Sequence, residues 1–445
     1  MNKLPGRIPS VADGDTAACQ TGDFSEVLSG LRGATILGIN PPAFDFTFFD
    51  FWSKPLGLLF ILDALREQGN DIHLVDCIYE GATEPLSFGR VRVERTEVRK
   101  PPPFAHIPRR YHRFGMNEEA FLQRLRCLPK PDYILVTSGM TYWYEGVRWC
   151  IGHLREIFPS VPLLLGGVYA RLCPAHAVRS GADMVQTEPL RLELNGPAMD
   201  LYDAPAYGVL MTSFGCPMAC EYCASRRLSP SYTERSVGEV LRDAARQFAL
   251  PGVHHAAFYD DALLINKERR FYPLCETLRT RFPHVQYHTP NGLHVHEIDR
   301  RCAEELKRTG FTTIRLSLES TDPGFQRRGS NKTTAEEFQF ACAQLVEAGY
   351  DIRRVETYIL AGLPGQSLRS VEESIRFVQR CGARARLAEY SPVPDTPMFE
   401  EVAARMPELR REPLLSNKSV FSTYVAGILA PEAMQSLKNL AGEKP

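Results

Sequence analysis

The pattern of apolar and polar positions divides the chain into two long series in which predicted strands and helices alternate. Residues 34–39 form a buried apolar run, residues 56–68 repeat apolar side chains at helical spacing, and residues 71–75 form the next apolar run. The alternation resumes at residues 133–137, 144–158 and 161–165. Because strands that alternate with helices form parallel sheets covered by helices, the first series predicts a doubly wound, Rossmann-like α/β domain.

A second series begins near residue 207. Six strand-like runs, with helical stretches between them, lie near residues 207–212, 255–259, 284–288, 312–318, 353–360 and 385–390. Capping-box patterns mark three helix starts, at Ser236-x-x-Glu239, Thr334-x-x-Glu337 and Ser370-x-x-Glu373. Gly349 and Gly382 are expected to end helices. Six successive strand–helix units predict a partial (β/α)6, TIM-like barrel, whose functional groups gather at the carboxyl ends of the strands.

These patterns predict five segments. They are an N-terminal lead-in without periodicity, the Rossmann-like domain, a linker, the partial barrel and a short C-terminal cover, at residues 1–30, 31–190, 191–206, 207–400 and 401–445. A polar stretch at residues 80–113, which contains three consecutive prolines, interrupts the first series and is expected to be an insertion or a lid.

Composition removes several classes of protein from consideration. Hydrophobic and charged residues make up 44% and 24% of the chain, as in ordinary globular proteins. The 52 basic and 53 acidic residues almost cancel, so no overall charge favours nucleic acid or a membrane surface as a partner. No apolar run has the length of a signal peptide or of a membrane span, and we therefore expect a cytoplasmic protein.

Three of the twelve cysteines are spaced for metal chemistry. Cys216, Cys220 and Cys223 form a C-x3-C-x2-C triplet just after the first strand of the barrel series. Thiolates are the usual ligands of iron–sulfur clusters, and three of them would leave one iron of a 4Fe-4S cluster open to another molecule. The alternative is a zinc site, which needs four ligands and is usually built from two C-x2-4-C units. This segment contains only one such unit.

With Tyr222 before the last cysteine, the triplet resembles the signature of the radical S-adenosylmethionine (radical SAM) enzymes. The resemblance implies a 4Fe-4S cluster and S-adenosylmethionine as cofactors, with a flavodoxin- or ferredoxin-type protein as reductant. It also implies reductive cleavage of S-adenosylmethionine to a 5′-deoxyadenosyl radical, which removes hydrogen from a small polar metabolite. Nucleic acid is not expected as a substrate, because neither a second cysteine triplet nor a basic C-terminal domain is found.

The ends of the later strands supply further candidates. Ser317 and Glu319 lie on the polar face of an alternating strand, which suggests a hollow barrel; an exposed edge strand is the alternative. The family resemblance implies that Glu319 binds the ribose, that the Tyr259-Asp260-Asp261 segment lies where the methionine amine is held, and that Gly362 lies near the adenine. A surface turn is the alternative for these last two segments.

Catalytic candidates come from two strands. His294, which follows the third strand together with Asn291, is a candidate for the substrate site. Glu356 and Tyr358 share one face of the fifth strand, and either is a candidate for an acid, a base or a radical relay. A structural role is the alternative for His294, and the sequence does not choose among the roles of Glu356 and Tyr358.

The first domain, residues 34–185, resembles the cobalamin-binding-type domain that precedes some barrels of this family. Ser138 and the pair Gly166-Gly167 are expected to approach the nucleotide tail of the cofactor. The Asp-x-His-x-x-Gly loop that supplies the lower cobalt ligand is missing. Cobalamin is therefore expected either to bind without a histidine ligand or to be absent, with the domain serving as a scaffold.

Three functions follow from these features. With cobalamin, the enzyme is expected to transfer a methyl group; without it, to dehydrate or rearrange a hydroxylated substrate. The third alternative is a non-catalytic iron–sulfur or cobalamin-binding regulator, which would form no 5′-deoxyadenosine.

Overall fold

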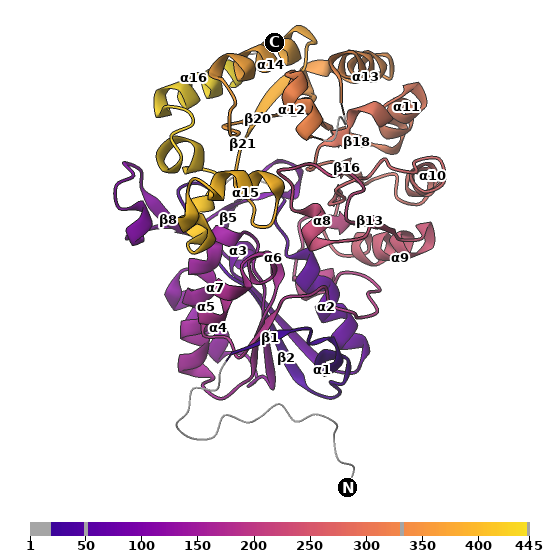
Figure 1. Cartoon of the computed structure of the whole chain (residues 1–445). Helices are drawn as coiled ribbons and strands as arrows, with labels where there is room; N and C mark the ends of the chain where they lie inside the picture. The colour runs from indigo at the N-terminus through magenta and orange to yellow at the C-terminus, as the bar shows by residue number, and fades with distance from the viewer. Residues whose placement is uncertain (1–18, 49–51, 330–332, 443–445) are drawn as a thin grey trace. The chain divides into compact units, whose positions relative to one another are not determined.

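The computed structural model describes residues 19–48, 52–329 and 333–442 (Figure 1). The chain forms two compact units, the first containing residues 1–203 with 411–414 and the second containing residues 204–410 with 415–445. Residues 411–414 belong to the first unit, where the Tyr144 hydroxyl donates a hydrogen bond to Glu412 at 2.9 Å. In the part of the chain that the structure describes, no helix combines the length and apolarity needed to cross a membrane.

The first unit is built on a six-stranded sheet in which every neighbouring pair of strands is parallel. In spatial order the strands are β1 (Gln20–Gly22), β11 (Met184–Gln186), β10 (Leu163–Leu165), β9 (Tyr133–Val136), β2 (Thr35–Asn40) and β4 (Asp71–Asp76). The strands β2, β9, β10 and β11 are almost wholly buried, as expected for a parallel sheet covered on both faces. The order reverses between β2 and β9, because the chain runs outward from β2 first to β4 and then, from β9, in the opposite direction.

The helices of this unit lie on both faces of the sheet, which confirms the doubly wound architecture (Figure 1). They are α1 (Ser25–Ser29), α2 (Leu56–Glu67), α3 (Cys77–Glu80), α4 (Glu118–Arg126), α5 (Tyr144–Ile157), α6 (Gly167–Leu172) and α7 (Pro174–Ala177). The expected lead-in is partly structured, because β1 pairs with β11 and α1 follows directly. A three-residue strand is too short to leave a readable period-two pattern in the sequence.

The polar stretch 80–113 forms small antiparallel sheets rather than a continuation of the main sheet. β5 (Ala82–Pro85) pairs with β6 (Val91–Val93). β7 (Arg95–Val98) pairs with β8 (Tyr111–Phe114), which in turn pairs with β3 (Ala43–Asp45). The insertion is therefore tied to the segment that follows β2.

The second unit contains two four-stranded parallel sheets. The first consists of β12 (Gly208–Leu210), β15 (His255–Phe258), β16 (Gln286–His288) and β18 (Phe311–Thr313); the second of β17 (Leu293–His294), β19 (Arg315–Glu319), β20 (Glu356–Ala361) and β21 (Arg384–Glu389). β18 and β19 are separated only by Ile314, so one stretch of chain passes from the first sheet to the second. The six predicted strand regions thus lie side by side in chain order, as in a partial TIM-like barrel.

Helices surround the strands of the second unit (Figure 1). They are α8 (Ser225–Leu228), α9 (Val237–Phe248), α10 (Phe271–Arg281), α11 (Arg300–Thr309), α12 (Pro323–Arg328), α13 (Ala335–Glu347), α14 (Leu368–Arg380), α15 (Pro397–Ala403) and α16 (Pro431–Gly442). The helix α15 belongs to a separate apolar cluster, against which Phe325 of α12 packs. The apolar faces of α9, α10, α11, α13, α14 and α16 share one core with the strands, which runs from Leu210 to Leu440. This core fixes the strand ends on which the site described below is built.

Two of the three predicted capping boxes are present, at Ser236–Glu239 and Thr334–Glu337. The third prediction is wrong, because α14 begins at Leu368 and is capped by Ser367, whose hydroxyl accepts a hydrogen bond from the Ser370 N–H. Ser367 and Ser370 both fit the N-cap preference, and the sequence alone does not distinguish them. Gly349 and Gly382 lie just beyond the ends of α13 and α14 with positive φ, as predicted.

Candidate functional site

The cysteine triplet lies in an irregular loop between two short elements of the second unit. The strand β13 (Ser213–Phe214), which pairs with β14 (Thr233–Glu234), leads into the loop, and α8 follows it. Gly215 opens the loop at φ +77°, where a Cβ would also lie 3.0 Å from the Ser231 carbonyl oxygen. Glycine is therefore required at this turn.

The three cysteines line one cavity of about 140 Å³. The cavity is formed by Cys216, Met218, Cys220, Cys223, Ser225, Arg226, Asp261, Asn291, Gly292, His294 and Ser317. Apart from the cysteine loop and its continuation into α8, these residues lie within or directly after β15, β16, β17 and β19. Burial raises the pKa of the Cys216 thiol to about 11. Among the described residues, no three His, Cys, Asp or Glu side chains form a group that could hold a single metal ion.

The two neighbouring aspartates after β15 have different surroundings. Asp260 is buried, and its carboxylate accepts hydrogen bonds from the Thr212 N–H at 3.0 Å and from the Ser213 hydroxyl at 2.8 Å. It also lies 3.7 Å from the Arg270 guanidinium. The two aspartates proposed from the sequence for cofactor binding are therefore placed differently: Asp260 joins the segments after two neighbouring strands, whereas Asp261 lines the cavity.

The segment after β16 is held against its neighbours on both sides. The Asn291 side-chain amide donates hydrogen bonds to the carbonyl oxygens of Tyr259, at 3.0 Å, and Asp260, at 3.1 Å. Ser317 lies so close to Gly292 that a Cβ there would overlap its hydroxyl. Tyr259 contributes this backbone acceptor, while its own hydroxyl lies 3.3 Å from that of Tyr207. These contacts fix the cavity wall that also carries His294.

Tyr222 and Glu319 are brought together by the turn at Gly329. A Cβ added at Gly329 would lie 3.2 Å from a Glu319 carboxylate oxygen and 3.3 Å from the Tyr222 hydroxyl. Glu319 ends β19 with φ +70°, a strained conformation for a residue with a side chain. The predicted ribose ligand and the aromatic residue of the triplet are therefore near neighbours. The sequence offered no signal that Gly329 would join them.

Glu356 and Tyr358 are not among the residues that line the cavity. Glu356 is the first residue of β20 and pairs with Arg315 at 2.9 Å and Arg386 at 2.5 Å. Burial alone would raise the pKa of Glu356, but the bonds from Arg386 and Arg315 hold it below its usual value. The Tyr358 hydroxyl donates to the Pro290 carbonyl at 2.9 Å and accepts from Arg315 at 3.0 Å. The alternating pattern correctly predicted that Glu356 and Tyr358 share a face of β20. Both side chains interact there with Arg315, and Glu356 also pairs with Arg386.

Gly362 packs against the C-terminal segment. The Ser422 hydroxyl donates to the Gly362 carbonyl at 3.1 Å, and a Cβ on Gly362 would overlap that hydroxyl. The Gln366 side chain accepts from the Gly362 N–H at 2.9 Å. Small size at this position is explained by these contacts.

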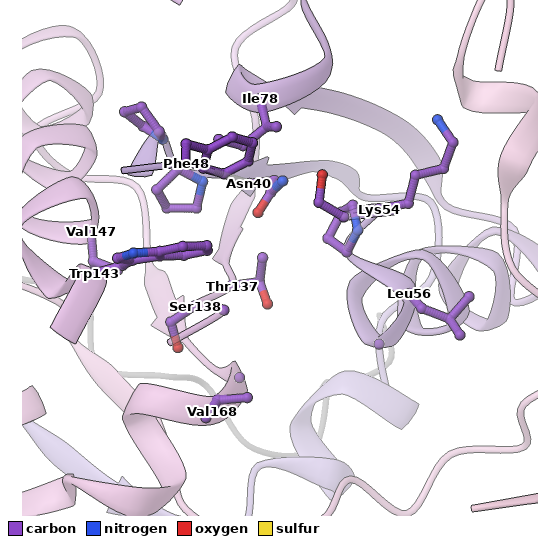
Figure 2. A pocket seen from close by; sticks show the side chains of 17 residues that line it. Asn40, Phe48, Lys54, Leu56, Ile78, Thr137, Ser138, Trp143, Val147 and Val168 are labelled. Atoms are coloured by element: carbon purple, nitrogen blue, oxygen red, sulfur yellow. The ribbon is translucent and has the colours of Figure 1, made fainter. Parts of the chain in front are cut away.

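A second cavity, of about 260 Å³, lies in the first unit (Figure 2). It opens at the carboxyl ends of β2, β9 and β10, where the strand order reverses. Such switch points are the usual ligand sites of open α/β sheets. The walls are formed by Asn40, Pro41, Pro42, Phe48, Ser53, Lys54, Pro55, Leu56, Gly57, Ile78, Thr137, Ser138, Gly139, Trp143, Val147, Gly167 and Val168.

The predicted Ser138, Gly166 and Gly167 meet at this cavity as two linked loops. The Ser138 hydroxyl donates to the Gly166 carbonyl at 2.7 Å. Gly167 has φ +86°, and a Cβ there would lie 2.6 Å from the backbone of Ser138. The glycine pair therefore allows the loops after β9 and β10 to approach each other, and Ser138 and Gly167 face the cavity.

The aromatic wall and a buried lysine were not predicted as a unit. The rings of Trp143 and Phe48 lie 5.9 Å apart, and the Trp143 indole donates to Asp45 at 2.9 Å. The Lys54 side chain points away from the centre of the cavity (Figure 2), and its ammonium lies 4.1 Å from the Tyr79 ring and 3.9 Å from the Tyr202 ring. Burial lowers the pKa of Lys54 to about 7. Phe48 belongs to a run rich in aromatic residues at positions 44–52, of which residues 49–51 lie outside the described residues.

Comparison with known proteins finds one family model that matches part of the second unit. Residues 210–378 match the family model of the radical SAM superfamily. An uncharacterized methyltransferase of Pyrococcus horikoshii is 24% identical over 210 residues, which cover 46% of this chain and 44% of that protein. This chain therefore matches less than half the length of its curated relative.

Two solved structures share the fold over most of the chain. The radical S-adenosylmethionine methyltransferase TsrM from Kitasatospora setae, described with cobalamin and a [4Fe-4S] cluster bound, aligns with TM-score 0.60 and 14% identity, covering 84% of this chain and 75% of that one. OxsB, a cobalamin-dependent S-adenosylmethionine radical enzyme, aligns with TM-score 0.52 and 15% identity, covering 87% and 57%. At these identities the likeness concerns the fold.

Proposed function

We propose that this chain, whose residues 210–378 match the radical SAM superfamily model, is a radical SAM enzyme that cleaves S-adenosylmethionine reductively and removes a hydrogen atom from a small polar substrate. The observation that carries the proposal is the convergence of Cys216, Cys220 and Cys223 on one cavity at the carboxyl ends of the strands. When bound there, a 4Fe-4S cluster would supply the electron that breaks the sulfonium bond to the adenosyl carbon.

The donor set of the cavity fits such a cluster and its co-substrate. Three thiols are the protein ligands that a cluster with one open iron requires. Asp261 lines the same cavity, where its carboxylate would attract the amino group of the methionine moiety. Ser317, together with Glu319 at the end of the same strand, would accept hydrogen bonds from ribose hydroxyls.

The remaining polar wall supports a small polar substrate. Asn291, His294 and Arg226 offer an amide, an imidazole and a guanidinium around the same space. The Asn291 amide is already oriented by two backbone carbonyls, so its oxygen is held in a fixed direction. We propose that His294 contacts the substrate and holds or moves a proton there.

We further propose that the cavity of the first unit takes the nucleotide tail of cobalamin, which would direct the chemistry toward methyl transfer. TsrM and OxsB, both described with cobalamin, share the fold of this chain. The cavity combines an apolar aromatic wall with the hydroxyls of Thr137 and Ser138, which suits a planar base attached to a sugar. It also lies at the switch point of the sheet.

The lining favours cobalamin without a protein ligand on its lower face. None of the seventeen residues that line the cavity is a histidine. The same observation favours a second candidate function, in which the first unit is a scaffold and the substrate is dehydrated or rearranged. In either case we propose a cytoplasmic location and a flavodoxin- or ferredoxin-type electron donor.

Metal content tests both candidates. The protein would be purified anaerobically, reconstituted with iron and sulfide, offered hydroxocobalamin and desalted. About four irons and one cobalt per chain would support the cobalamin-dependent enzyme. About four irons without cobalt would support dehydration or rearrangement, and absence of iron would overturn the whole proposal.

A further inference from the structure

The loop that carries the cysteines has little regular structure of its own. Between β13 and α8, residues 215–223 form neither helix nor strand. The positions of the thiols therefore depend on contacts made by the loop with other parts of the second unit. The partners of metal ligands commonly set both the geometry and the affinity of a site.

One residue of the loop, Glu221, is held from two directions. Its N–H donates to the Arg328 carbonyl at 3.0 Å, and its carbonyl accepts from the Met398 N–H at 3.1 Å. Its carboxylate accepts from Arg328 Nε at 2.7 Å. The loop is thus joined through one residue to the end of α12 and the start of α15.

Arg328 extends this connection to a second carboxylate. Its other guanidinium nitrogen donates to Glu401, within α15, at 2.6 Å. The Arg328 side chain is 26% exposed, and those of Glu221 and Glu401 are 37% and 38% exposed. A planar guanidinium can bridge two carboxylates in fixed directions, which a single ammonium does less well.

The residues on either side of Glu221 are held by the same elements. In its thiol form, Cys220 donates to the carbonyl of Gly329, the residue after Arg328, at 3.3 Å. This bond would be lost when the thiolate binds iron, whereas the contacts of Glu221 and Tyr222 would remain. The Tyr222 ring packs against an apolar cluster that includes Met398 and Phe399 of α15 and Phe421 further along the chain. Residues 220–222 are therefore clamped between the turn at 328–329 and the segment that begins with α15.

We propose that Arg328 is a positioning residue for the iron–sulfur cluster, acting through Glu221 and Glu401 to hold the middle of the cysteine loop. The inference rests on the proposed function, because it concerns the cluster that the three cysteines would bind. It assigns the start of the C-terminal segment a role in retaining the cluster, beyond covering the barrel. Arg328 itself does not line the cavity.

Iron release measures this role without relying on turnover. Reconstituted proteins would be mixed anaerobically with an excess of a coloured ferrous chelator, and the rate of iron loss recorded. We expect Arg328→Met to lose iron roughly 10- to 100-fold faster than the unaltered protein. Arg328→Lys is expected to fall between them. The electron paramagnetic resonance spectrum of the reduced cluster is expected to change in Arg328→Met.

Matched controls lie next to each altered residue. Arg327 is exposed on the same helix, and Arg327→Met should release iron at the unaltered rate. Glu400 lies beside Glu401 and pairs with the exposed Arg410 at 2.5 Å, so Glu400→Gln should also have no effect. Glu401→Gln weakens only the ion pair between Arg328 and Glu401 and leaves the one with Glu221. It replaces Arg328→Met as the test variant if Arg328→Met folds poorly. Combined with Arg328→Met, Glu401→Gln should add no further acceleration.

The outcomes separate this inference from the proposed function. Iron in the unaltered protein, with faster release from Arg328→Met and Glu401→Gln at unchanged unfolding temperature, supports the inference. Equal release rates and spectra in Arg328→Met, Arg327→Met and the unaltered protein would overturn it while leaving the proposed function intact. Acceleration that only follows a fall in unfolding temperature would also overturn it. Failure of the unaltered protein to bind iron would remove the proposed function itself.

Discussion

The two cavities of this chain lie at equivalent places, the carboxyl ends of parallel strands, but the side chains that line them differ in polarity. The cavity of the second unit is lined by thiols, a carboxylate, a guanidinium and an imidazole. The cavity of the first unit is lined mainly by apolar and aromatic side chains and by turns that contain glycine and proline. The polar wall in the second unit can bind and activate reacting groups, whereas the apolar wall in the first unit mainly provides a complementary shape for a bound molecule. The predictions below test that division, from the largest expected effect to the smallest.

The largest expected effect is the loss of iron from a variant that lacks one of the three cysteines. Cys220→Ala leaves two thiols for the cluster, and we expect iron to fall from about four to below one per chain after reconstitution. Absorbance near ~400 nm and cleavage of S-adenosylmethionine should be lost with it. Any cobalt bound in the first unit should be unaffected. Cys127→Ala, which removes an exposed thiol of the first unit, is the control; full iron content in Cys220→Ala would contradict the assignment.

A bulky side chain in the apolar cavity should reduce the binding of cobalt and leave the binding of iron unchanged. Gly57 lines that cavity near the start of α2, and a Cβ there meets nothing within 4 Å. Gly57→Phe should therefore reduce cobalt binding at least about tenfold, equivalent to about 1.4 kcal/mol, and leave iron content unchanged. Gly152→Phe is the matched control, since Gly152 is an exposed glycine of α5 that also has open space around it. Equal cobalt binding in both variants would place the cofactor elsewhere.

The two adjacent aspartates should show opposite phenotypes. Asp261→Asn removes a charge from the cavity wall and should weaken binding of S-adenosylmethionine about tenfold, measured by equilibrium dialysis of the reconstituted protein. Asp260→Asn instead disturbs a buried set of hydrogen bonds and should lower the stability of the fold by about 1–3 kcal/mol. Weaker binding in Asp260→Asn at unchanged stability would reverse the roles given to the two residues.

The smallest effect concerns Lys54 beside the apolar cavity. Its pKa is about 7 in the folded protein, below the usual 10.5, so the unfolded chain binds more protons between these values and stability rises with pH across that window. Lys54→Met removes the cost of burying the ammonium but also loses its contacts with the Tyr79 and Tyr202 rings, so we expect a net gain in stability of only about 1 kcal/mol near pH 7. The unfolding temperature should rise accordingly, and the difference should shrink toward pH 10. Thermal unfolding measured at several pH values provides the test. The prediction would be contradicted if the unfolding temperatures of the two proteins changed with pH in the same way.

The sequence predicted the architecture well because alternating patterns are local. The strands β2, β4, β9 and β21 lie within one residue of the predicted positions, and β20 begins three residues later than predicted. The strand β1 was missed because three residues carry no readable period, and its place depends on β11, which lies far along the chain. The capping prediction at Ser370 failed because two serines competed for one helix start.

The candidate site could be predicted only where the spacing of residues along the chain indicates their chemistry. The cysteine triplet identified its cavity directly, while the different surroundings of Asp260 and Asp261 depend on Thr212 and Ser213, which follow the neighbouring strand β12. Glu356 was proposed from the correct face of its strand, but its partners Arg315 and Arg386 come from neighbouring strands. The bridge through Arg328 joins three segments distant in sequence, which no local pattern reveals.

The central claim is that the cysteine cavity supports reductive cleavage of S-adenosylmethionine. The most direct test incubates the anaerobically reconstituted protein with S-adenosylmethionine and dithionite and measures 5′-deoxyadenosine by chromatography and mass spectrometry. We predict 5′-deoxyadenosine from the unaltered protein and none from Cys216→Ala, Cys220→Ala or Cys223→Ala. Absence of 5′-deoxyadenosine from a protein that has bound about four irons would contradict the account and leave a non-catalytic iron–sulfur protein in its place.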